Sequence, residues 1–341
     1  MSSRSLLAAV VLAASSFLLA CSSGGAAAPD GGAGRVTVMV PSADAGDDAA
    51  NEADVGPPLT TVLSDDFQTW LGANGYAADD FASVGAGGSF GGRAAAGDPV
   101  AKIPIVFVHG NSDAAIGRSP TDFTGWDAPR RYFLAHGWTD AALYGTTWGP
   151  ADAAKANDQT HDHAYLTRLR RFFSAVQQYV GAPKIVVVAH SMGTTLARKA
   201  IEGGSGEDAE GSYALGAPLT SIVDTFVGIA GANLGLTGCY VQPDPPACSK
   251  IYGFWPGGDA NAGPATVLAR MNATPHFEAT HVFSLCSSDD EVLGLGGIVW
   301  GRDTCSIPGE DANARDDSLR HVPLKDQSGP IVEKLITTHA P

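Results

Sequence analysis

Basic residues are scarce in this chain. Its 341 residues include 21 Lys and Arg against 36 Asp and Glu, which gives a formal net charge of −15 at pH 7. A charge of this sign repels the phosphates of nucleic acids and the headgroups of anionic lipids. The composition therefore argues against a nucleic-acid partner.

Charged residues of both signs are also few, at 17%, whereas hydrophobic residues make up 44% and aromatic residues 8%. This balance excludes a wholly disordered chain and a coiled coil, and it predicts a globular domain. The sequence contains no HExxH motif, no CxxC pair and no carboxylate cluster that demands a metal. We therefore expect neither a metal nor an organic cofactor.

The N-terminus has the pattern of an export signal. Arg4 precedes an apolar run over residues 6–20 that is too short for a stable membrane span. The run ends in Leu-Leu-Ala-Cys21, which resembles the bacterial lipobox, in which the cysteine is acylated after cleavage. We expect residues 1–20 to be a lipoprotein signal peptide and Cys21 to anchor the exported protein in a membrane, the outer one where the cell has one. The alternative is a free secreted protein that is cleaved nearby.

Residues 21–58 consist largely of Ala, Gly, Asp and Pro and show no sustained periodicity. Such a segment buries too little apolar surface to offset the entropy of ordering it, so we expect a disordered tether. The remaining residues, 59–341, contain no internal repeat and no second break in composition. They are expected to form a single domain.

Apart from Cys21 the chain has four cysteines, an even number for an exported protein. They fall into two local pairs, Cys239 with Cys248 and Cys286 with Cys305. Four cysteines allow three connectivities, and the local one closes short loops, each of which contributes about 3 kcal/mol in the chain-entropy estimate. We predict these two disulfides. A zinc site is the weaker alternative, because CxxC spacing is lacking.

Buried strands alternate with helices along the domain. Residues 103–108 and 184–189 are almost continuously apolar, as in strands covered on both faces of a parallel sheet. Between them, apolar residues recur at three- and four-residue spacing over 165–180, which predicts a helix. Further helices are expected at 127–136, 194–200 and 330–338, and further strands at 221–229 and 281–285. The alternation predicts an α/β fold with a doubly wound, mostly parallel sheet.

The strongest chemical signal is the pentapeptide Ala189-His190-Ser191-Met192-Gly193, which follows the apolar run at 184–189. A serine that attacks a carbonyl must be presented on a tight strand-to-helix turn, which requires small residues on both sides. Ala in the first place is a mild departure from the usual Gly. We predict Ser191 to be a catalytic nucleophile.

Acyl transfer also needs two backbone N–H donors for the oxyanion. Met192, the residue after the nucleophile, supplies one. The loop His109-Gly110-Asn111 after the first strand offers the other through the Asn111 N–H. His109 is expected to brace this loop by hydrogen bonding, and His190 has the same expected role, with its side chain on the far side of the turn from Ser191.

In such folds the acid and then the base follow the serine along the chain, each in a loop at the carboxyl end of a strand. The loop after residues 281–285 carries three carboxylates, of which Asp290 is our choice and Asp289 the alternative. The base must follow, which leaves His321, expected in a loop before the final helix, and His339, close to the chain end. We predict His321. Surface or packing roles are expected for four other histidines: His161, His163, His276 and His281.

Together these motifs, with Gly235-Leu236-Thr237-Gly238-Cys239 and Asp290-Glu291-Val292, resemble the class-2 secreted lipases. They also resemble the single-domain extracellular poly(3-hydroxybutyrate) depolymerase. The resemblance covers roughly residues 103–338 and implies an α/β-hydrolase fold, a triad of Ser191, Asp290 and His321, and oxyanion donors Asn111 and Met192. It implies a serine carboxylester hydrolase, of the lipase or esterase kind, with residues 59–341 as the catalytic domain.

The natural ester is less well specified, because the shared motifs belong to the chemistry. We expect a lipid or other water-insoluble ester, with a polyester as the alternative, and a monomeric protein. The segment 251–256 and three tryptophans, Trp126, Trp138 and Trp148, either form an apolar mouth or pack into the core. A non-enzymatic alternative is a catalytically silent hydrolase fold that serves as a surface binding protein.

Overall fold

The computed structural model describes residues 37–39 and 58–341. The expected signal peptide, Cys21 and most of the expected tether lie outside the described residues. Their roles therefore stay predictions. Among the described residues, no helix is both long and apolar enough to cross a membrane.

A central sheet runs through the described part of the chain, and its strand order is β1-β12-β9-β8-β5-β3-β4-β2. All neighbouring strands are parallel except β2, which pairs antiparallel with β4. The strands are β1 (Thr37–Met39), β2 (Ser89–Phe90), β3 (Ile105–Val108), β4 (Leu143–Thr146), β5 (Ile185–His190), β8 (Val223–Ile229), β9 (His281–Cys286) and β12 (Ala312–Arg315). The chain thus has the doubly wound, mostly parallel sheet that the sequence predicts.

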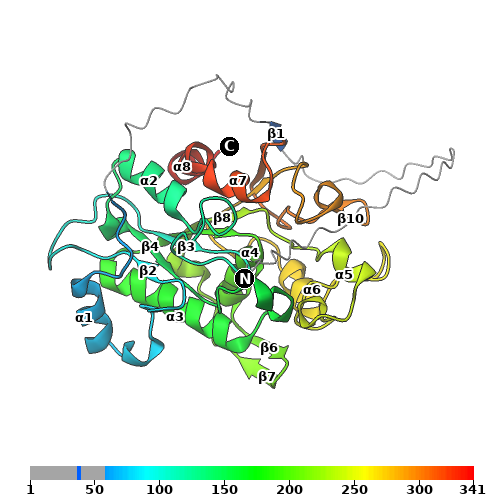
Figure 1. The fold of residues 1–341 in the computed structure, drawn as a ribbon, viewed down its shortest axis with the longest axis horizontal. Helices are drawn as coiled ribbons and strands as arrows, with labels where there is room; N and C mark the ends of the chain where they lie inside the picture. Colours follow the sequence, from blue (N-terminus) through cyan, green and yellow to red (C-terminus); the bar gives the residue numbers. More distant parts are fainter. Residues whose placement is uncertain (1–36, 40–57) are drawn as a thin grey trace, which may run out of the picture. The chain divides into compact units, whose positions relative to one another are not determined.

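Helices cover both faces of this sheet, and Figure 1 shows α2, α7 and α8 on one side and α1 and α3 on the other. The helices are α1 (Asp65–Ala73), α2 (Asp127–Ala135), α3 (His163–Val180), α4 (Met192–Glu202), α5 (Thr237–Val241), α6 (Thr266–Ala273), α7 (His321–Asp326) and α8 (Gly329–Thr338). Two small hairpins project from the connections: β6 (Ser205–Asp208) with β7 (Gly211–Ala214), and β10 (Ile298–Val299) with β11 (Arg302–Asp303). The connecting segments also contain short 3₁₀ helices, which are η1 (Ala77–Asp79), η2 (Asp140–Ala142), η3 (Ala153–Asp158), η4 (Thr220–Ile222), η5 (Pro246–Cys248) and η6 (Leu295–Gly297).

Alternate residues of each central strand belong to two hydrophobic clusters, one on each face of the sheet. In β3, Ile105 and Phe107 pack with α2, α7 and α8, whereas Val106 and Val108 pack with α1, α3 and α4. Because successive side chains of a strand point to opposite faces, a strand covered on both sides must be apolar throughout. This explains why β3 and β5 are continuous apolar runs.

Helix α3 illustrates how local sequence sets the element ends. The Asp162 carboxylate accepts a hydrogen bond from the Ala164 N–H, and Gly181 ends the helix with a φ of +69°. An Asp side chain satisfies a free N–H at the helix start, and Gly adopts the left-handed conformation at the end without steric cost. The helix predicted over 165–180 therefore begins two residues earlier than its apolar pattern suggests.

One expectation about local structure was wrong. His321 is not in a loop but is the first residue of α7, a short helix that precedes α8. The periodic pattern did not reveal α7 because the helix has six residues and includes Pro323. Its first turn, with Pro at the third position, tolerates the missing N–H.

Candidate active site

Ser191 lies at the sharp turn between β5 and α4, at the carboxyl end of the central strand. Its backbone has φ +55° and ψ −130°, and its N–H donates to the Ile229 carbonyl of β8 at 2.8 Å. A non-glycine residue held in this conformation costs about 1–3 kcal/mol, and such strain concentrates at functional sites. Ser191 thus belongs to neither the strand nor the helix, and its side chain is half-buried.

Glycines allow the loop after β3 to approach this turn. A Cβ on Gly193 would lie 2.3 Å from the His109 carbonyl oxygen, and a Cβ on Gly110 would lie 3.0 Å from the Ser191 Cβ. Both distances are shorter than ordinary contacts, so any side chain there would push the loop away. The close approach explains why the sequence has Gly at both positions.

The loop after β3 makes a tight turn that contains Asn111. The Asp113 N–H donates to the Gly110 carbonyl at 3.3 Å, and Ser112 has a φ of +63°. The Asn111 side-chain amide donates to the Ala156 carbonyl at 2.9 Å, which fixes this residue. Within the described residues, the backbone N–H groups of Asn111 and Met192 donate no hydrogen bond. Both amides are therefore available to an oxyanion.

His109 braces the loop. It is buried, its Nδ1–H donates to the Gly110 carbonyl at 2.8 Å, and its Nε2 accepts from the Trp148 N–H at 3.1 Å. Burial lowers the pKa of His109 to about 3. Both ring nitrogens are hydrogen-bonded and the ring is neutral at neutral pH, so His109 holds the loop and its lone pair is already occupied.

His190 is also a brace. Its ring packs against His321, with ring centroids 4.6 Å apart. Its Nε2–H donates to the His321 carbonyl at 3.1 Å. Burial, and secondly the adjacent His321, lowers the pKa of His190 well below its usual value. His190 therefore connects the strand that carries Ser191 to the first residue of α7.

The side chains of His321 and Asp290 form a direct hydrogen bond. The His321 Nδ1 lies 2.7 Å from the Asp290 Oδ2, and both side chains are buried. The other Asp290 oxygen accepts the N–H groups of Val292 and Leu293, each at 2.9 Å. Because a carboxylate only accepts, Nδ1 carries the ring proton and Nε2 keeps its lone pair. This is the tautomer that a general base requires.

The two alternatives for acid and base lie elsewhere. Asp289 is exposed, and its N–H donates to the Ser287 hydroxyl, whereas the carboxylate bonded to the His321 ring is that of Asp290. His339 stacks on His281 at 3.7 Å and pairs with Asp224 at 3.3 Å. These partners lie at the N-terminal ends of β8 and β9, whereas Ser191 follows the C-terminal end of the parallel strand β5. The structure thus brings Asp290, and not its neighbour, to His321.

The family profile of the class 2 lipases matches residues 102–332, well over half of the chain. The chain belongs to the class 2 lipase family. Among solved structures, the mature Bacillus licheniformis lipase BlEst2 is 15% identical to it, with a TM-score of 0.46, over 74% of this chain and 98% of that one. A truncated carbohydrate esterase from gut microbiota is 13% identical, with a TM-score of 0.48, over 71% and 87%. A search of curated proteins found no match.

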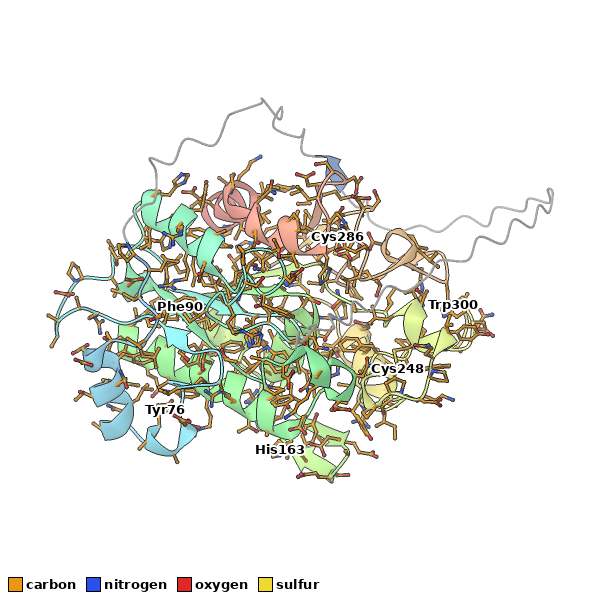
Figure 2. The ribbon with its side chains drawn as sticks, viewed as in Figure 1. Tyr76, Phe90, His163, Cys248, Cys286 and Trp300 are labelled. Atoms are coloured by element: carbon orange, nitrogen blue, oxygen red, sulfur yellow. A yellow bond between two sulfur atoms is a disulfide. The ribbon has the colours of Figure 1, made fainter. Side chains whose placement is uncertain are left out.

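In this class 2 lipase family member, both disulfides have the pairing that the sequence predicts, Cys239–Cys248 and Cys286–Cys305. The zinc alternative was wrong, because the bonded sulfurs are not thiolates. Asp303 lies close to the sulfurs of the second pair, but a disulfide leaves no strong metal ligand there. Cys286, labelled in Figure 2, ends β9, and its disulfide with Cys305 closes the loop that carries Asp290.

The tryptophans do not form an apolar mouth. Trp126, Trp138 and Trp148 are at most 3% exposed, so the core-packing alternative is correct for all three. Five of the exposed apolar side chains lie on α5, on the loop that carries Asp290 and at the start of β10, and we call this set the apolar rim. Its members are Tyr240, Val241, Val292, Leu295 and Ile298. Helix α5 and the loop are neighbours, since a Cβ on Gly294 would lie 3.5 Å from the Thr237 hydroxyl.

Sequence reasoning missed one residue that holds the base. The Glu291 carboxylate accepts the His321 N–H at 3.0 Å and faces Arg320 at 3.4 Å. Its position next to Asp290 was the available signal, because a loop that supplies the acid also lies beside the base. A second missed residue, Lys325, is considered below.

Proposed function

We propose that this protein is a serine carboxylester hydrolase that acts through an acyl-enzyme on lipid or other water-insoluble esters. The observation that carries the proposal is the His321–Asp290 hydrogen bond, at 2.7 Å, at the sheet edge where Ser191 occupies its strained turn. Membership in the class 2 lipase family supports the same chemistry. The triad is Ser191, His321 and Asp290.

In the proposed mechanism, Ser191 Oγ attacks the ester carbonyl while His321 Nε2 takes its proton. Asp290 keeps the proton on Nδ1 and stabilises the imidazolium that forms. The N–H groups of Asn111 and Met192 bind the oxyanion of the tetrahedral intermediate. His321 then protonates the departing alcohol, and water, activated by the same imidazole, releases the acid and restores Ser191.

The apolar rim supports a water-insoluble substrate. Val292 and Leu295 are 53% and 79% exposed and follow Asp290 in the same loop, and Val241 on α5 is 78% exposed. An apolar surface beside a catalytic group favours contact with an apolar aggregate over a soluble ester. A lipid emulsion and a polyester particle both provide such a surface, so the assay must include both.

The test is covalent labelling followed by an assay panel. A fluorophosphonate should label the wild type at Ser191, and Ser191→Ala should lose labelling and about a million-fold in turnover. Exposed Ser221→Ala is the matched control and should keep both. Triglyceride emulsion, short p-nitrophenyl esters and amorphous poly(3-hydroxybutyrate) then identify the ester. A Ser191→Ala protein that keeps more than a few per cent of activity contradicts the proposal, and a wild type without labelling indicates a binding protein.

The localisation proposal concerns residues outside the described part of the chain. We infer that the protein is exported and anchored through acylated Cys21, and the two disulfides are compatible with export. Several acyl chains hold a protein firmly in a membrane, whereas one gives marginal binding. Wild-type protein should therefore fractionate with membranes and Cys21→Ser should not. A soluble wild type with an unmodified mature N-terminus contradicts the anchor.

A further inference from the structure

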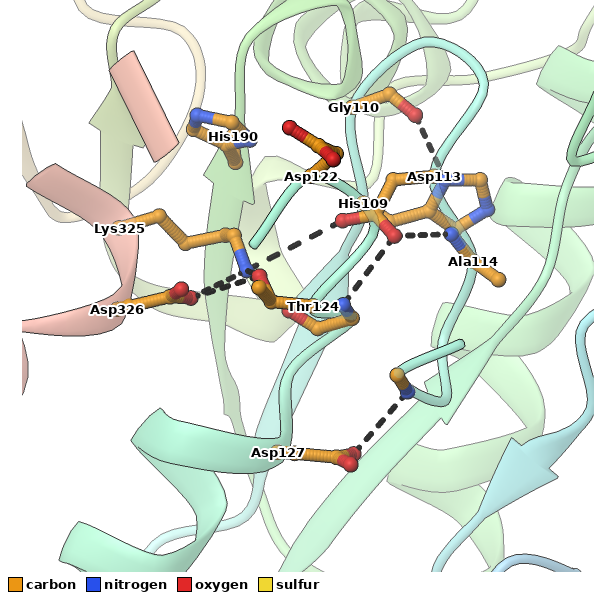
Figure 3. Close-up of polar contacts among 12 residues, drawn as sticks. His109, Gly110, Asp113, Ala114, Asp122, Thr124, Asp127, His190, Lys325 and Asp326 are labelled. Carbon is orange, nitrogen blue, oxygen red and sulfur yellow. Dashed lines mark hydrogen bonds and ion pairs between the residues drawn. The ribbon is translucent and has the colours of Figure 1, made fainter. Parts of the chain in front are cut away.

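A fully buried lysine follows His321 by one helical turn. Lys325 of α7 has no exposed surface, and its ammonium donates to the Thr124 hydroxyl at 2.7 Å and to the Asp326 carboxylate at 2.6 Å. It also donates to the Gly125 carbonyl. The Asp113 Oδ2 lies 4.0 Å from the ammonium. Figure 3 draws this ion pair as a dashed line. The three N–H donors of the ammonium therefore have three acceptors, and the Asp113 carboxylate is a fourth neighbour, with a charge opposite to that of the lysine.

Most of these partners belong to the segment that follows the Asn111 turn. Asp113 closes that turn through its N–H, and its Oδ1 accepts the N–H groups of Ala114 at 2.9 Å and Gly125 at 3.2 Å. Burial raises the pKa of the Asp113 carboxyl, and the Lys325 cation acts in the opposite direction. The Asp113 carboxylate and the Lys325 ammonium thus make the hydrogen bonds that join the start of the segment 113–125 to its end.

Burying the Lys325 ammonium costs free energy, because the charge loses its hydration. Replacing buried ion pairs by apolar side chains of similar volume is often neutral or stabilising, so stability alone does not account for Lys325. What the lysine provides is a fixed connection, because it joins residues 201 positions apart in sequence. One end of the connection is the helix that begins at His321, and the other is the turn that presents the Asn111 N–H.

We propose that Lys325 is a positioning residue that, with Asp113, sets the placement of the His321 helix relative to the Asn111 oxyanion donor. This inference rests on the proposed ester hydrolysis. The base must reach the Ser191 hydroxyl and the leaving oxygen while the oxyanion donor reaches the carbonyl oxygen of the same ester, and a shift of about 1 Å costs about 100-fold in rate. Lys325 acts through the placement of these groups and does not touch the substrate.

The test removes the connection and keeps the shape. In the double variant Asp113→Asn with Lys325→Met, the amide oxygen of the new side chain still accepts the two N–H groups of the turn, and Met fills the volume of the lysine stem. Asp326 keeps its bond to the Thr124 hydroxyl. With a short soluble ester, kcat should fall about 100-fold while KM stays within about threefold, because placement and not substrate binding is lost.

Lys199→Met is the matched control. Lys199 is 3% exposed and donates to Glu202, to the Gly203 carbonyl and to the Ser205 carbonyl, at the far end of α4 from Ser191. Its loss should lower the melting temperature and leave kcat within about twofold. The proposal is overturned by a folded double variant with kcat close to the wild type, or by a Lys199→Met variant that loses turnover equally.

Hydrogen exchange separates this proposal from the proposed function. Amides of α7 and of residues 110–125 should exchange faster in the double variant than in the wild type, while those of α3 stay protected. This result supports the connection even if the wild type hydrolyses no ester, in which case only the proposed function fails. Unchanged exchange in both segments overturns the connection whatever the activity.

Discussion

Two adjacent carboxylates in one loop have opposite environments. Asp290 is 2% exposed, accepts two backbone N–H groups and bonds His321, whereas Asp289 faces solvent. Neighbouring residues in a loop point in different directions, so one position of the pair meets the imidazole and the other does not. Burial is what distinguishes them, and the sequence alone does not display it.

Asp290→Asn should lower turnover by about four orders of magnitude, as an isosteric amide does to the triad acid of serine proteases. The amide still accepts from the loop N–H groups through its oxygen, but its NH₂ group faces Nδ1 and favours the wrong tautomer. Steady-state kinetics on a p-nitrophenyl ester measures the loss.

Asp289→Asn is the matched variant, and it should change turnover by less than about tenfold. Thermal unfolding of both variants checks that the loop stays folded. If the two kinetic effects come out reversed, Asp289 is the acid and the bond between Asp290 and His321 has only a structural role.

At the scale of elements, the helices and strands with long apolar patterns were predictable from the sequence. Short elements of mixed composition were not. The strands β3, β5, β8 and β9 and the helices α2, α3, α4 and α8 each correspond to a predicted range, with ends shifted by at most a few residues. Two of the missed strands, β4 and β12, have four residues each and contain Gly, Thr, Asn or Arg, which carry little periodic signal. They pair at the sheet because neighbouring strands offer free backbone groups, not because of their own composition.

The candidate site shows the same division. Ser191 was predictable because its turn imposes small residues at fixed spacing, and the order of acid and base limited the other positions. The pairing of Asp290 with His321 agrees with that reasoning. Lys325 was not predictable, since lysine is almost never fully buried and a single lysine in a helix indicates a solvent-facing position.

The disulfide of the acid loop should matter more for activity than the other disulfide. Each closes a short loop, with a sequence separation of 19 between Cys286 and Cys305 and of 9 between Cys239 and Cys248, and each contributes about 3 kcal/mol in the chain-entropy estimate. Replacing Cys286 and Cys305 by Ser frees the loop that holds Asp290. We expect turnover on a soluble ester to fall at least about tenfold more than unfolding explains.

The double Cys239→Ser, Cys248→Ser variant is its control. It should lose a similar amount of stability in urea and keep most of its turnover on the same soluble ester, because Cys239 and Cys248 lie outside the loop that holds Asp290. Equal loss of turnover in the two variants contradicts a specific role for the acid-loop disulfide.

At the scale of the whole molecule, buried neutral histidines make the fold sensitive to acid. Burial lowers the pKa of His109 to about 3 and that of His161 to about 4, and the pKa of His190 is lowered as well. The unfolded chain binds protons near the usual value of about 6.5, while the folded chain does not. The contribution of these histidines to stability is therefore complete above about pH 6.5 and is lost as the pH falls toward the folded values.

Each such histidine removes up to about 1.4 kcal/mol of stability per pH unit in this window. His161 donates to the Tyr252 carbonyl and contacts the Thr195 hydroxyl, and Gln is a polar replacement that does not titrate. Urea unfolding between about pH 7 and 4.5 should therefore show a shallower pH dependence in His161→Gln. A slope that is unchanged in His161→Gln contradicts the argument.

The position of the base on α7 has a consequence for refolding. His190 and His321 are 131 residues apart in sequence, and Thr124 and Lys325 are 201 apart, so the bonds that hold α7 are non-local. A chain in which α7 has not docked can have its serine turn, yet it has no base. We therefore expect the regain of activity during refolding to report the docking of α7 and not the formation of the sheet alone.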